Sequence, residues 1–450
     1  MTSAFLLAAP HSGSGKTTCT LAILAALRAR GLRVQAFKVG PDYIDPAHHA
    51  HITGRPSHNL DTWMLPAEAN WRLFATAAAD ADVCVVEGVM GLFDGVDGRR
   101  PLGSSADLAR QLGLPVVLVV DARSMARSAA ALVHGFATFD PELQLLGVVW
   151  NRVGSANHRR ILDESLATAG LPEALGALPR DGELCLAERH LGLVTPEDAA
   201  PTPAQVRRLA AVAEEHLDLD RLLAQTRRAV PCPPPAPAPV VSRSLRIGVA
   251  RDQAFCFYYA ENLRLLERAG ARLVPFRPCD GDGVPSGVAG LYLGGGYPEL
   301  HATRLSGNTA FLDGIRQLHQ AGTPIYAECG GFMTLCQGLT DANGAFHPMA
   351  GLYPARTEMN RRAFRLGYRE VRTAGAAGTE LTLRGHEFHY SHVSEMPAEV
   401  TRRYRVTNAR SEPLPAEGYQ LGNTLAGYIH LHFGSCPEFP LGLFGLTPPR

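Results

Sequence analysis

The sequence predicts an α/β protein of two domains, and three observations lead to this prediction. The chain of 450 residues is longer than one ordinary hydrophobic core supports. Apolar runs alternate with helical patterns along most of its length. The stretch PCPPPAPAP at residues 231–239 forms neither a helix nor a central strand and indicates a polyproline linker. We therefore expect a first domain over residues 1–229, a linker over 230–244 and a second domain over 245–450.

The apolar runs predict the direction of the strands. Before the linker they are Ala4–Ala9, Val34–Val39, Val83–Val86, Val116–Val120 and Leu145–Trp150. After it they are Leu245–Ala250, Leu273–Phe276, Leu291–Leu293 and Pro324–Ala327, followed by a strand-rich end. Near-continuous apolar strands that alternate with helices are typical of a parallel sheet covered on both faces. We expect such a sheet in the first domain and a sheet of mixed direction in the second.

Composition excludes several classes of partner. Lysine plus arginine equal aspartate plus glutamate at 43 each, so bulk charge favours neither nucleic acid nor an anionic membrane. No apolar run approaches the ~20 residues that cross a bilayer, and the N-terminus lacks the charged region of a signal peptide. Nine scattered cysteines without a CxxC pair favour reduced thiols. These observations predict a cytoplasmic protein with small-molecule substrates.

A phosphate-binding loop follows the first predicted strand. Residues 9–18 read APHSGSGKTT and precede the helical run Cys19–Arg30. In such a loop the backbone amides cradle phosphates, the lysine reaches the β- and γ-phosphates, and a threonine hydroxyl binds Mg²⁺. Pro10 stands where the strict pattern has glycine. The residues predicted to bind ATP are Gly13, Ser14, Gly15, Lys16, Thr17 and Thr18, with Thr17 also a metal ligand.

Carboxylates follow the next predicted strands, in VGPDYIDP (39–46) and VVEGVMGLFDG (85–95). Ligands bind at the carboxyl edge of an open α/β sheet, so these acids are candidates for the site. Glu87 is a candidate Mg²⁺ ligand. Asp42, Asp45 and Asp94 are candidates for metal or substrate positioning, with loop capping as the alternative.

Two further sets of polar residues lie in this half. Asn151 follows the strand Leu145–Trp150 and is a candidate for contact with the nucleotide base, with a plain turn as the alternative. His48, His49, His51 and His58 match no zinc spacing, and we expect them to be solvated or to line the substrate site.

The segment YAECGGFMTL (326–335) predicts a nucleophile. Cys329 stands between an apolar strand and a glycine pair, the position of a sharp turn. We expect an exposed sulfur above a helix N-terminus, whose dipole would lower the thiol pKa. The alternative is a buried cysteine at a strand end.

Two other segments of this half complete a hydrolytic site. Gly295 and Gly296, in a glycine run after the strand Leu291–Leu293, are candidates for an oxyanion hole. GYIHLHF (427–433) alternates like a strand, which would turn His430 and His432 to one face, and either could be the base. Together these are the parts of a glutaminase: cysteine attacks the amide, ammonia leaves, and water hydrolyses the thioester.

The second half resembles a class I glutamine amidotransferase domain of the cobyric-acid-synthase type. This resemblance implies a flavodoxin-like fold. The whole chain resembles the family of cobyrinic and hydrogenobyrinic acid a,c-diamide synthases. The resemblance rests on SGSGKTT, KVGPDYIDP, EGVMGLFDG, GGGYPE, AECGGFM, GHEFHYS (385–391) and YIHLHF. It implies a ligase of vitamin B12 biosynthesis. Such ligases use ATP and Mg²⁺ to activate two acetate side chains as acyl phosphates, and ammonia from glutamine then displaces phosphate.

The resemblance also implies roles for residues. Asp42, Tyr43, Ile44, Asp45 and Asp94 would lie near the acetate being activated, with Asp94 in the chemistry. Arg361 and Arg362, in an arginine-rich segment, would meet carboxylates of the macrocycle, although a solvated strand pair is the alternative. His386, Glu387, His389 and Tyr390 would line the cleft or support it. Most class I members carry His-Pro-Glu; that acid is missing after both candidate histidines here, so a Cys–His dyad is expected.

Three rival functions remain at this point: a cobyric acid synthase, a Ni-sirohydrochlorin a,c-diamide synthase, and a P-loop ATPase joined to an inactive amidotransferase-like module. The macrocycle's metal, the order of amidation and a homodimer are left open. An internal ammonia path from Cys329 to the first domain is expected.

Overall fold

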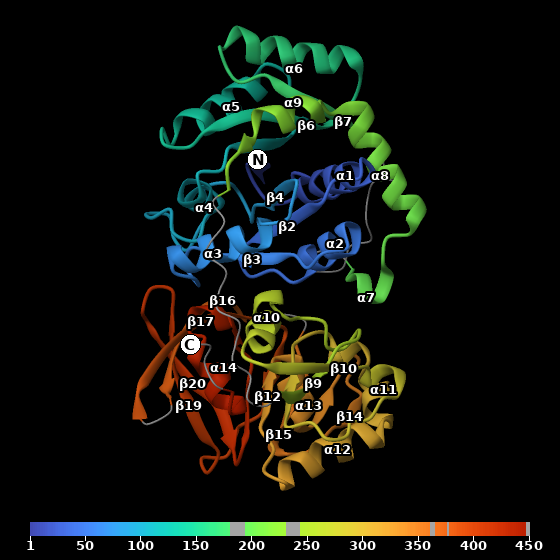
Figure 1. Ribbon diagram of the computed structural model, residues 1–450, viewed down its shortest axis with the longest axis vertical. Helices are drawn as coiled ribbons and strands as arrows, with labels where there is room; N and C mark the ends of the chain where they lie inside the picture. The colour runs from blue at the N-terminus through green and yellow to red at the C-terminus, as the bar shows by residue number, and fades with distance from the viewer. Residues whose placement is uncertain (181–193, 231–243, 361–364, 376–377, 447–450) are drawn as a thin grey trace. The chain divides into compact units, whose positions relative to one another are not determined.

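The computed structural model describes residues 1–180, 194–230, 244–360, 365–375 and 378–446. The chain falls into two compact units, Met1–Pro234 and Pro235–Arg450 (Figure 1). The proline-rich stretch 231–239 lies outside the described residues.

The first unit is a parallel sheet whose strands alternate with helices. Its strands are β1 (Thr2–Ala8), β2 (Val34–Val39), β3 (His58–Leu60), β4 (Val83–Glu87), β5 (Val116–Asp121), β6 (Leu145–Val153), β7 (Ala174–Pro179) and β8 (Arg227–Arg228). Its helices are α1 (Lys16–Ala29), α2 (Ile44–Thr53), α3 (Ala67–Ala78), α4 (Ser105–Leu112), α5 (Ser128–Thr138), α6 (Ala156–Thr168), α7 (Pro196–Ala199), α8 (Pro203–His216) and α9 (Leu219–Gln225). The strand order is β3-β2-β4-β1-β5-β6-β7, with the short β8 antiparallel to β1.

The order of these strands brings three chain segments together. β1 lies next to β4 and β4 next to β2, all parallel. The register pairs Glu87 with Leu7 on one side and with Lys38 on the other. The segments that follow β1, β2 and β4 therefore leave the sheet at the same edge, as parallel α/β topology requires.

The second unit holds a mixed sheet and a smaller sheet. The mixed sheet contains β9 (Leu245–Ala250), β10 (Ala271–Phe276), β11 (Gly290–Leu293), β12 (Ile325–Glu328), β16 (Arg365–Ala374), β17 (Glu380–His389), β19 (Thr401–Asn408), β20 (Pro413–Leu421), β21 (Thr424–Gly427) and β22 (His430–Leu431). The smaller one contains β13 (Cys336–Thr340), β14 (Phe346–Pro348), β15 (Tyr353–Met359) and β18 (Ser391–Val393). The helices are α10 (Ala260–Arg268), α11 (Ala302–Gly307), α12 (Thr309–Gln320), α13 (Gly330–Leu335) and α14 (Glu438–Phe444). Strands β10, β9, β11, β12 and β21 run parallel and the remainder antiparallel, which confirms the expected mixed direction.

The segment 427–433 is not the continuous strand that its alternation predicts. β21 ends at Gly427, β22 covers His430–Leu431, and a 3₁₀ turn follows at Phe433–Ser435. Side chains take the place of ladder partners here. Asn262 donates to the Leu431 carbonyl at 2.8 Å and accepts from the Phe433 amide at 2.7 Å. A side chain that satisfies the backbone can end a strand without leaving its groups unpaired.

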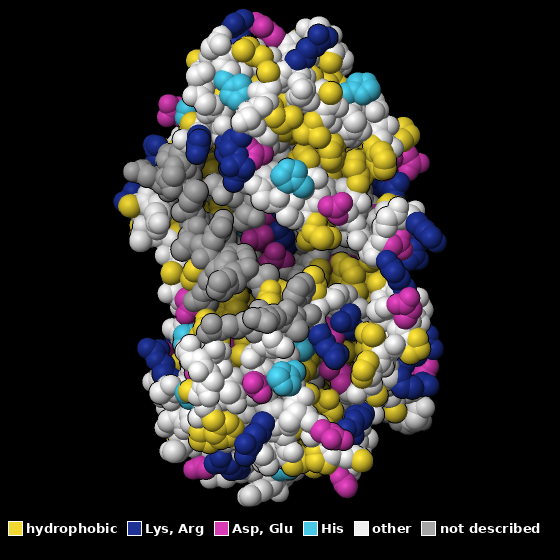
Figure 2. Space-filling model, turned by 180° about the vertical axis from the view of Figure 1, so that it is seen from behind, with side chains coloured by type: hydrophobic (Ala, Val, Ile, Leu, Met, Phe, Trp, Pro, Cys, Tyr) yellow, Lys and Arg dark blue, Asp and Glu magenta, His cyan; other side chains and the backbone are white. Residues whose placement is uncertain are grey.

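The surface carries both signs of charge. Basic and acidic side chains are interspersed over the face drawn in Figure 2. Among the described residues, no helix is both long and apolar enough to cross a membrane.

Candidate active sites

The first candidate site begins at the loop between β1 and α1. Gly13 and Gly15 adopt left-handed conformations, with φ of 82° and 87°. A β-carbon on Gly15 would lie 2.0 Å from Nδ2 of Asn151, so only glycine fits there. α1 begins at Lys16, directly after the loop. Glycine amides leading into the N-terminus of a helix form the geometry that binds phosphate.

Two residues of β6 hold this loop. Nδ2 of Asn151 donates to the Ser14 carbonyl at 2.9 Å, and its Oδ1 accepts from the Arg152 amide at 2.9 Å. The Arg152 guanidinium donates to the Gly13 carbonyl at 2.9 Å. Both ends of the Asn151 amide are thus engaged with the protein. Asn151 supports the loop, and its contact with a nucleotide base stays a prediction.

Three oxygen-bearing side chains meet at the start of α1. Oγ1 of Thr17 lies 2.7 Å from Oε1 of Glu87 and 3.3 Å from Oδ2 of Asp45. Nζ of Lys16 lies 3.4 Å from the same oxygen of Glu87. Mg²⁺ in phosphate sites takes one or two carboxylates plus hydroxyl, water and phosphate oxygens. The three side chains therefore fit a divalent cation beside bound phosphates.

Lys38 is the residue of this site that the sequence reasoning missed. Its ammonium lies 2.5 Å from Oδ2 of Asp45 and 3.0 Å from Oε1 of Glu87, and it donates to the Gly88 carbonyl at 3.1 Å. Its side chain is only 2% exposed. Lysine is almost never fully buried unless it is paired. A lysine inside the apolar run Val34–Val39 was the signal that could have revealed it.

His48, His49 and His58 are buried, which excludes solvated side chains, one of the two expected arrangements; that they line the substrate site stays a prediction. The physical reason is that α2 packs on β2, and that β3, which carries His58, pairs with β2. Nε2 of His49 lies 2.8 Å from Oε2 of Glu87, and its Nδ1 lies 3.1 Å from Oγ of Ser57. His49 therefore orients the carboxylate that the sequence had marked as a metal ligand.

The charges of this cluster offset one another. Burial by itself would raise the pKa of Glu87, but the cations of Lys38 and Lys16 outweigh it and hold that pKa well below its usual range. Burial, together with the carboxylates of Asp42 and Glu87, raises the pKa of Asp45 to about 8. Burial and the nearby Lys38 lower the pKa of Lys16. The cluster therefore keeps Glu87 ionised, whereas burial makes Asp45 harder to ionise than an exposed carboxyl group.

The predicted substrate residues lie around the start of α2. Oδ1 of Asp42 accepts from the amides of Ile44 and Asp45 at 2.8 and 3.1 Å, which caps the helix. Oδ2 of Asp42 lies 3.7 Å from Nζ of Lys38. Asp42 thus has the capping role that was the alternative, and it also faces the charge cluster. Tyr43 is buried beside it.

Asp94 lies in the segment after β4, which contacts the start of the phosphate loop. The Leu92 amide donates to the Ala9 carbonyl at 2.8 Å. Oδ2 of Asp94 accepts from the Gly91 amide at 2.9 Å, which stabilises the turn. The fold therefore brings the segment of Asp94 to the loop, while its role in the chemistry stays a prediction.

The second candidate site forms where β12 meets α13. Cys329 takes φ 47° and ψ −103°, an uncommon conformation for a residue with a side chain. A β-carbon on Gly331 would lie 2.4 Å from the Leu293 carbonyl oxygen, and one on Gly330 would lie 2.8 Å from Cδ of Pro298. Both glycines are needed because the turn packs directly against the glycine run after β11.

The thiol is not exposed as predicted. Cys329 is 6% exposed, and burial raises the pKa of its thiol far above the usual range. α13 has only six residues, and burial outweighs any effect of its N-terminus. The prediction of a thiol activated by the helix is therefore wrong. A base must take the proton when the nucleophile forms.

The glycine run lies over this turn. The Gly331 amide donates to the Gly294 carbonyl at 3.0 Å. The Gly296 nitrogen lies 3.2 Å from the position that a β-carbon on Gly330 would occupy. Gly296 takes φ 152°, which turns its amide as few other residues could. The arrangement suits the predicted oxyanion hole of Gly295 and Gly296.

The two candidate bases have different surroundings. Cε1 of His430 lies 2.3 Å from the position of a β-carbon on Gly295, so its ring lies against the glycine run. His432 is fully buried, its Nδ1 accepts from the Gly434 amide at 3.1 Å, and its ring packs on Tyr259 at 4.6 Å. Contact with the glycine run favours His430 as the base.

A carboxylate that the sequence reasoning missed faces His430. Oε2 of Glu328 lies 4.0 Å from Nδ1 of His430. Three groups hold this carboxylate: the hydroxyls of Tyr326 and Tyr292 at 2.7 and 3.0 Å, and the Leu431 amide at 3.0 Å. Burial raises the pKa of Glu328 to about 7 and lowers that of His430 to about 3. The available signal was an acid at the end of an apolar strand, directly before the cysteine.

The segment GHEFHYS supports this site from inside the unit. Glu387 pairs with Arg369 at 2.6 Å and with His389 at 2.7 Å. His386 stacks on His430 with ring centres 5.0 Å apart. These side chains are buried, so a supporting role is favoured over the cleft lining that was also considered. Arg361 and Arg362 lie outside the described residues.

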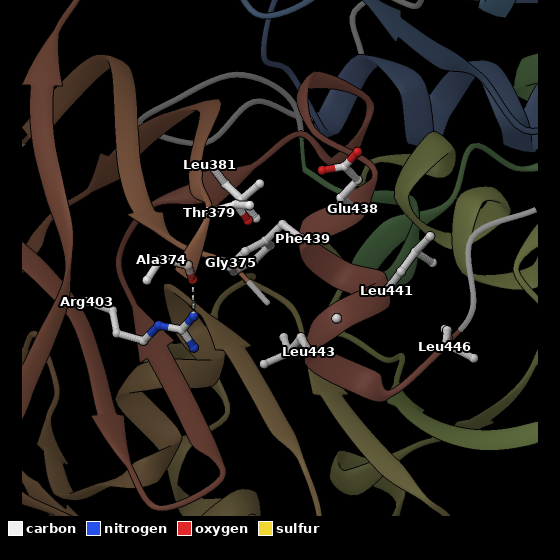
Figure 3. A pocket seen from close by; sticks show the side chains of 11 residues that line it. Ala374, Gly375, Thr379, Leu381, Arg403, Glu438, Phe439, Leu441, Leu443 and Leu446 are labelled. Carbon is white, nitrogen blue, oxygen red and sulfur yellow. Dashed lines mark hydrogen bonds between the residues drawn. The ribbon is translucent and has the colours of Figure 1, made fainter. Parts of the chain in front are cut away.

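A separate cavity of about 560 Å³ opens between α14 and the paired strands β16 and β17 (Figure 3). Its lining is mostly apolar, with Leu381, Phe439 and Leu443 among the side chains drawn. Arg403 donates to the Ala374 carbonyl at 2.6 Å beside it. Its lining includes none of the site residues described above, so it is distinct from both sites.

Both halves of the chain match known families. Residues 5–193 match the CobQ/CobB/MinD/ParA nucleotide binding domain, and residues 246–437 match the CobB/CobQ-like glutamine amidotransferase domain. The cobyrinate a,c-diamide synthase of Syntrophotalea carbinolica is 47% identical over 96% of this chain and 96% of its own length. That of Salmonella typhimurium is 43% identical over 97% and 96%. The hydrogenobyrinate a,c-diamide synthase of Brucella abortus is 44% identical over 95% and 98%. The chain therefore belongs to the family of cobyrinate and hydrogenobyrinate a,c-diamide synthases, with a nucleotide-binding domain followed by a glutamine amidotransferase domain.

Proposed function

We propose that the protein uses ATP and glutamine to convert the a and c acetate carboxylates of cobyrinic or hydrogenobyrinic acid into amides, in the cytoplasm. The names of its full-length relatives support this substrate class. The observation that carries the proposal is that one chain holds two different sites. The first places Thr17 and Glu87 beside a phosphate-binding loop, and the second places Cys329 on a sharp turn that packs on the glycine run after β11. A ligase that takes its nitrogen from glutamine needs both.

The first site answers the problem of the leaving group. A carboxylate does not react with ammonia at neutral pH because its oxygen leaves poorly. Transfer of the γ-phosphoryl group of ATP to that oxygen gives an acyl phosphate, from which phosphate leaves readily. The loop amides and Lys16 would bind the phosphates of ATP, and the buried ammonium of Lys38 would hold Asp45 and Glu87 in place beside them. Thr17, Asp45 and Glu87 would hold Mg²⁺, which neutralises phosphate charge when bound.

The second site supplies the nitrogen. The Cys329 thiol would give its proton to His430, and the thiolate would attack the side-chain amide carbon of glutamine. The amides of Gly295 and Gly296 would bind the developing oxyanion. The leaving nitrogen would take the proton from His430 and depart as ammonia, and water would hydrolyse the thioester to glutamate. Release inside the protein delivers neutral ammonia, whereas free ammonia at pH 7 is mostly ammonium.

Two experiments test this function. Mass spectrometry after incubation with ATP, Mg²⁺ and glutamine should show double amidation of cobyrinic or hydrogenobyrinic acid. Ni-sirohydrochlorin and a cobyric acid synthase substrate serve as competing substrates, and amidation of only one of these would replace the proposed substrate. The variant Cys329→Ala should lose synthesis with glutamine and keep it with ammonium.

The remaining rival is a P-loop ATPase joined to an inactive module. A glutaminase assay separates the two, because the inactive module releases no glutamate from glutamine. Nucleotide binding without amidation of any substrate and without glutamate release would favour the rival.

A further inference from the structure

Glu328 holds a position that the glutaminase scheme does not yet use. It ends β12 and directly precedes Cys329, so the turn that sets the nucleophile also sets this carboxylate. The register pairs Glu328 with Gly427 on β21, three residues before His430. The Leu431 amide donates to Oε1 of Glu328 at 3.0 Å. The backbone of β22 is thereby tied to the carboxylate that faces its histidine.

We propose that Glu328 is the positioning residue of His430: the negative charge of its carboxylate favours the tautomer that carries the proton on Nδ1 and stabilises the imidazolium that forms when the base takes the Cys329 proton. This inference rests on the proposed glutaminase. It supplies, from the strand before the nucleophile, the acid that is absent after the histidine. Oε2 of Glu328 and Nδ1 of His430 are 4.0 Å apart, within the range at which an opposite charge favours the protonated ring. With Nδ1 carrying the proton, Nε2 is the nitrogen left to accept the proton of the thiol.

The Nδ1 of His432 has a different partner. Its Nδ1 accepts from the Gly434 amide, which assigns the proton to its other nitrogen. Its ring packs on Tyr259, whose hydroxyl lies 2.8 Å from Nδ1 of His386. The Nδ1 of His432 thus accepts from a backbone amide, whereas the Nδ1 of His430 faces a carboxylate at 4.0 Å, and this difference separates the two histidines that the sequence left equivalent.

The ionisable groups around Glu328 and His430 determine which ionisation appears in the pH dependence of the rate. Glu328 faces the tyrosines of β11 and β12 and lies near Tyr258 and Tyr404, and burial raises the pKa of all four phenols. His430 faces His386, His389 and Glu387. Burial holds the pKa of His386 well below its usual range. Burial by itself would raise the pKa of Glu387, but His389 and Arg369 outweigh it and lower that pKa to about 2. Of the groups facing the pair whose pKa is shifted, Glu328 is the one placed near 7. Below that pH it becomes neutral and no longer stabilises the imidazolium.

The test is the pH profile of kcat/KM for glutamate release from glutamine by the full chain. In the native protein the rate should rise with pH through an apparent pKa of about 7 as Glu328 loses its proton. We call this rise the acid limb of the profile. Glu328→Gln keeps an oxygen for the tyrosine and amide donors but removes the charge. We expect a loss of about 100-fold above pH 8, an unchanged KM for glutamine, and convergence with the native rate near pH 5. Glu328→Asp should restore part of the rate together with the acid limb.

Two controls keep the outcomes distinct. Glu417 is also buried, accepts from the Ile429 amide at 3.0 Å and has its pKa raised by burial to about 8, but its described contacts do not include His430. Glu417→Gln should keep the acid limb. Synthesis with ammonium should be unchanged in Glu328→Gln, which reports a folded protein with an intact first site.

Any of three outcomes overturns the inference. Glu328→Gln could keep the acid limb, or it could lose the same fraction of activity at every pH. Alternatively, Glu417→Gln could remove the acid limb instead. A failure of the proposed function looks different: Cys329→Ala would then keep the native rate of glutamate release.

Discussion

Replacing Lys38 with methionine should unfold the first unit at a much lower denaturant concentration. Methionine keeps most of the volume of the lysine stem but removes an ammonium that contacts Asp45, Glu87 and the Gly88 carbonyl within 3.1 Å. Glu87 is fully buried, so the variant leaves its charge with less compensation in a low-dielectric site. Breaking a buried ion pair from one side costs about 3–5 kcal/mol. Lys16 and His49 still face Glu87, so we expect about 3 kcal/mol, at the lower end.

Tryptophan fluorescence during urea unfolding measures this change in the full chain. The three tryptophans, Trp63, Trp71 and Trp150, all lie in the first unit, so the signal reports that unit alone. Arg30→Met is the matched control, because Arg30 also contacts two carboxylates, Glu214 and Asp220, but at the surface. It should cost less than about 1 kcal/mol.

The double variant Lys38→Met, Glu87→Gln sharpens the argument. Neutralising Glu87 removes the charge that the first change left uncompensated, so part of the lost stability should return. A loss below about 1 kcal/mol in Lys38→Met would refute the reasoning. So would a double variant that is less stable than Lys38→Met, because the cost would then come from packing and not from charge.

Three further predictions concern activity. His430→Asn should lower glutamate release at least about 100-fold while His432→Asn keeps measurable activity, and the opposite order in a glutaminase assay would assign the base to His432. Gly331→Ala places a β-carbon 2.4 Å from the Leu293 carbonyl oxygen, so synthesis with glutamine should be lost and synthesis with ammonium kept; equal loss of both would indicate global misfolding. Thr17→Ala removes a proposed metal ligand, so the Mg²⁺ concentration for half-maximal synthesis should rise about tenfold, and an unchanged Mg²⁺ titration would contradict that role.

The sequence by itself determined the elements whose signal is local. The strands Val34–Val39 and Leu245–Ala250 have the bounds that their apolar runs predict, because a buried parallel strand needs a continuous run of such residues. Gly13 and Gly15 indicate the phosphate loop, because a left-handed backbone conformation before a helix favours glycine. The order of the motifs also predicted the family, and the similarity to full-length relatives confirmed it.

Only the tertiary structure decided which distant side chains share a site. Lys38 and Glu87 meet because β2 and β4 are neighbours, a pairing that no local pattern in either strand encodes. Glu328 faces His430 although 101 residues separate them in the sequence, because β12 pairs with β21 just before β22. Burial, which raises the pKa of the Cys329 thiol, is likewise a property of the packed domain. Hydrophobic periodicity constrains which face of an element is buried, whereas partner choice and the local dielectric depend on the whole fold.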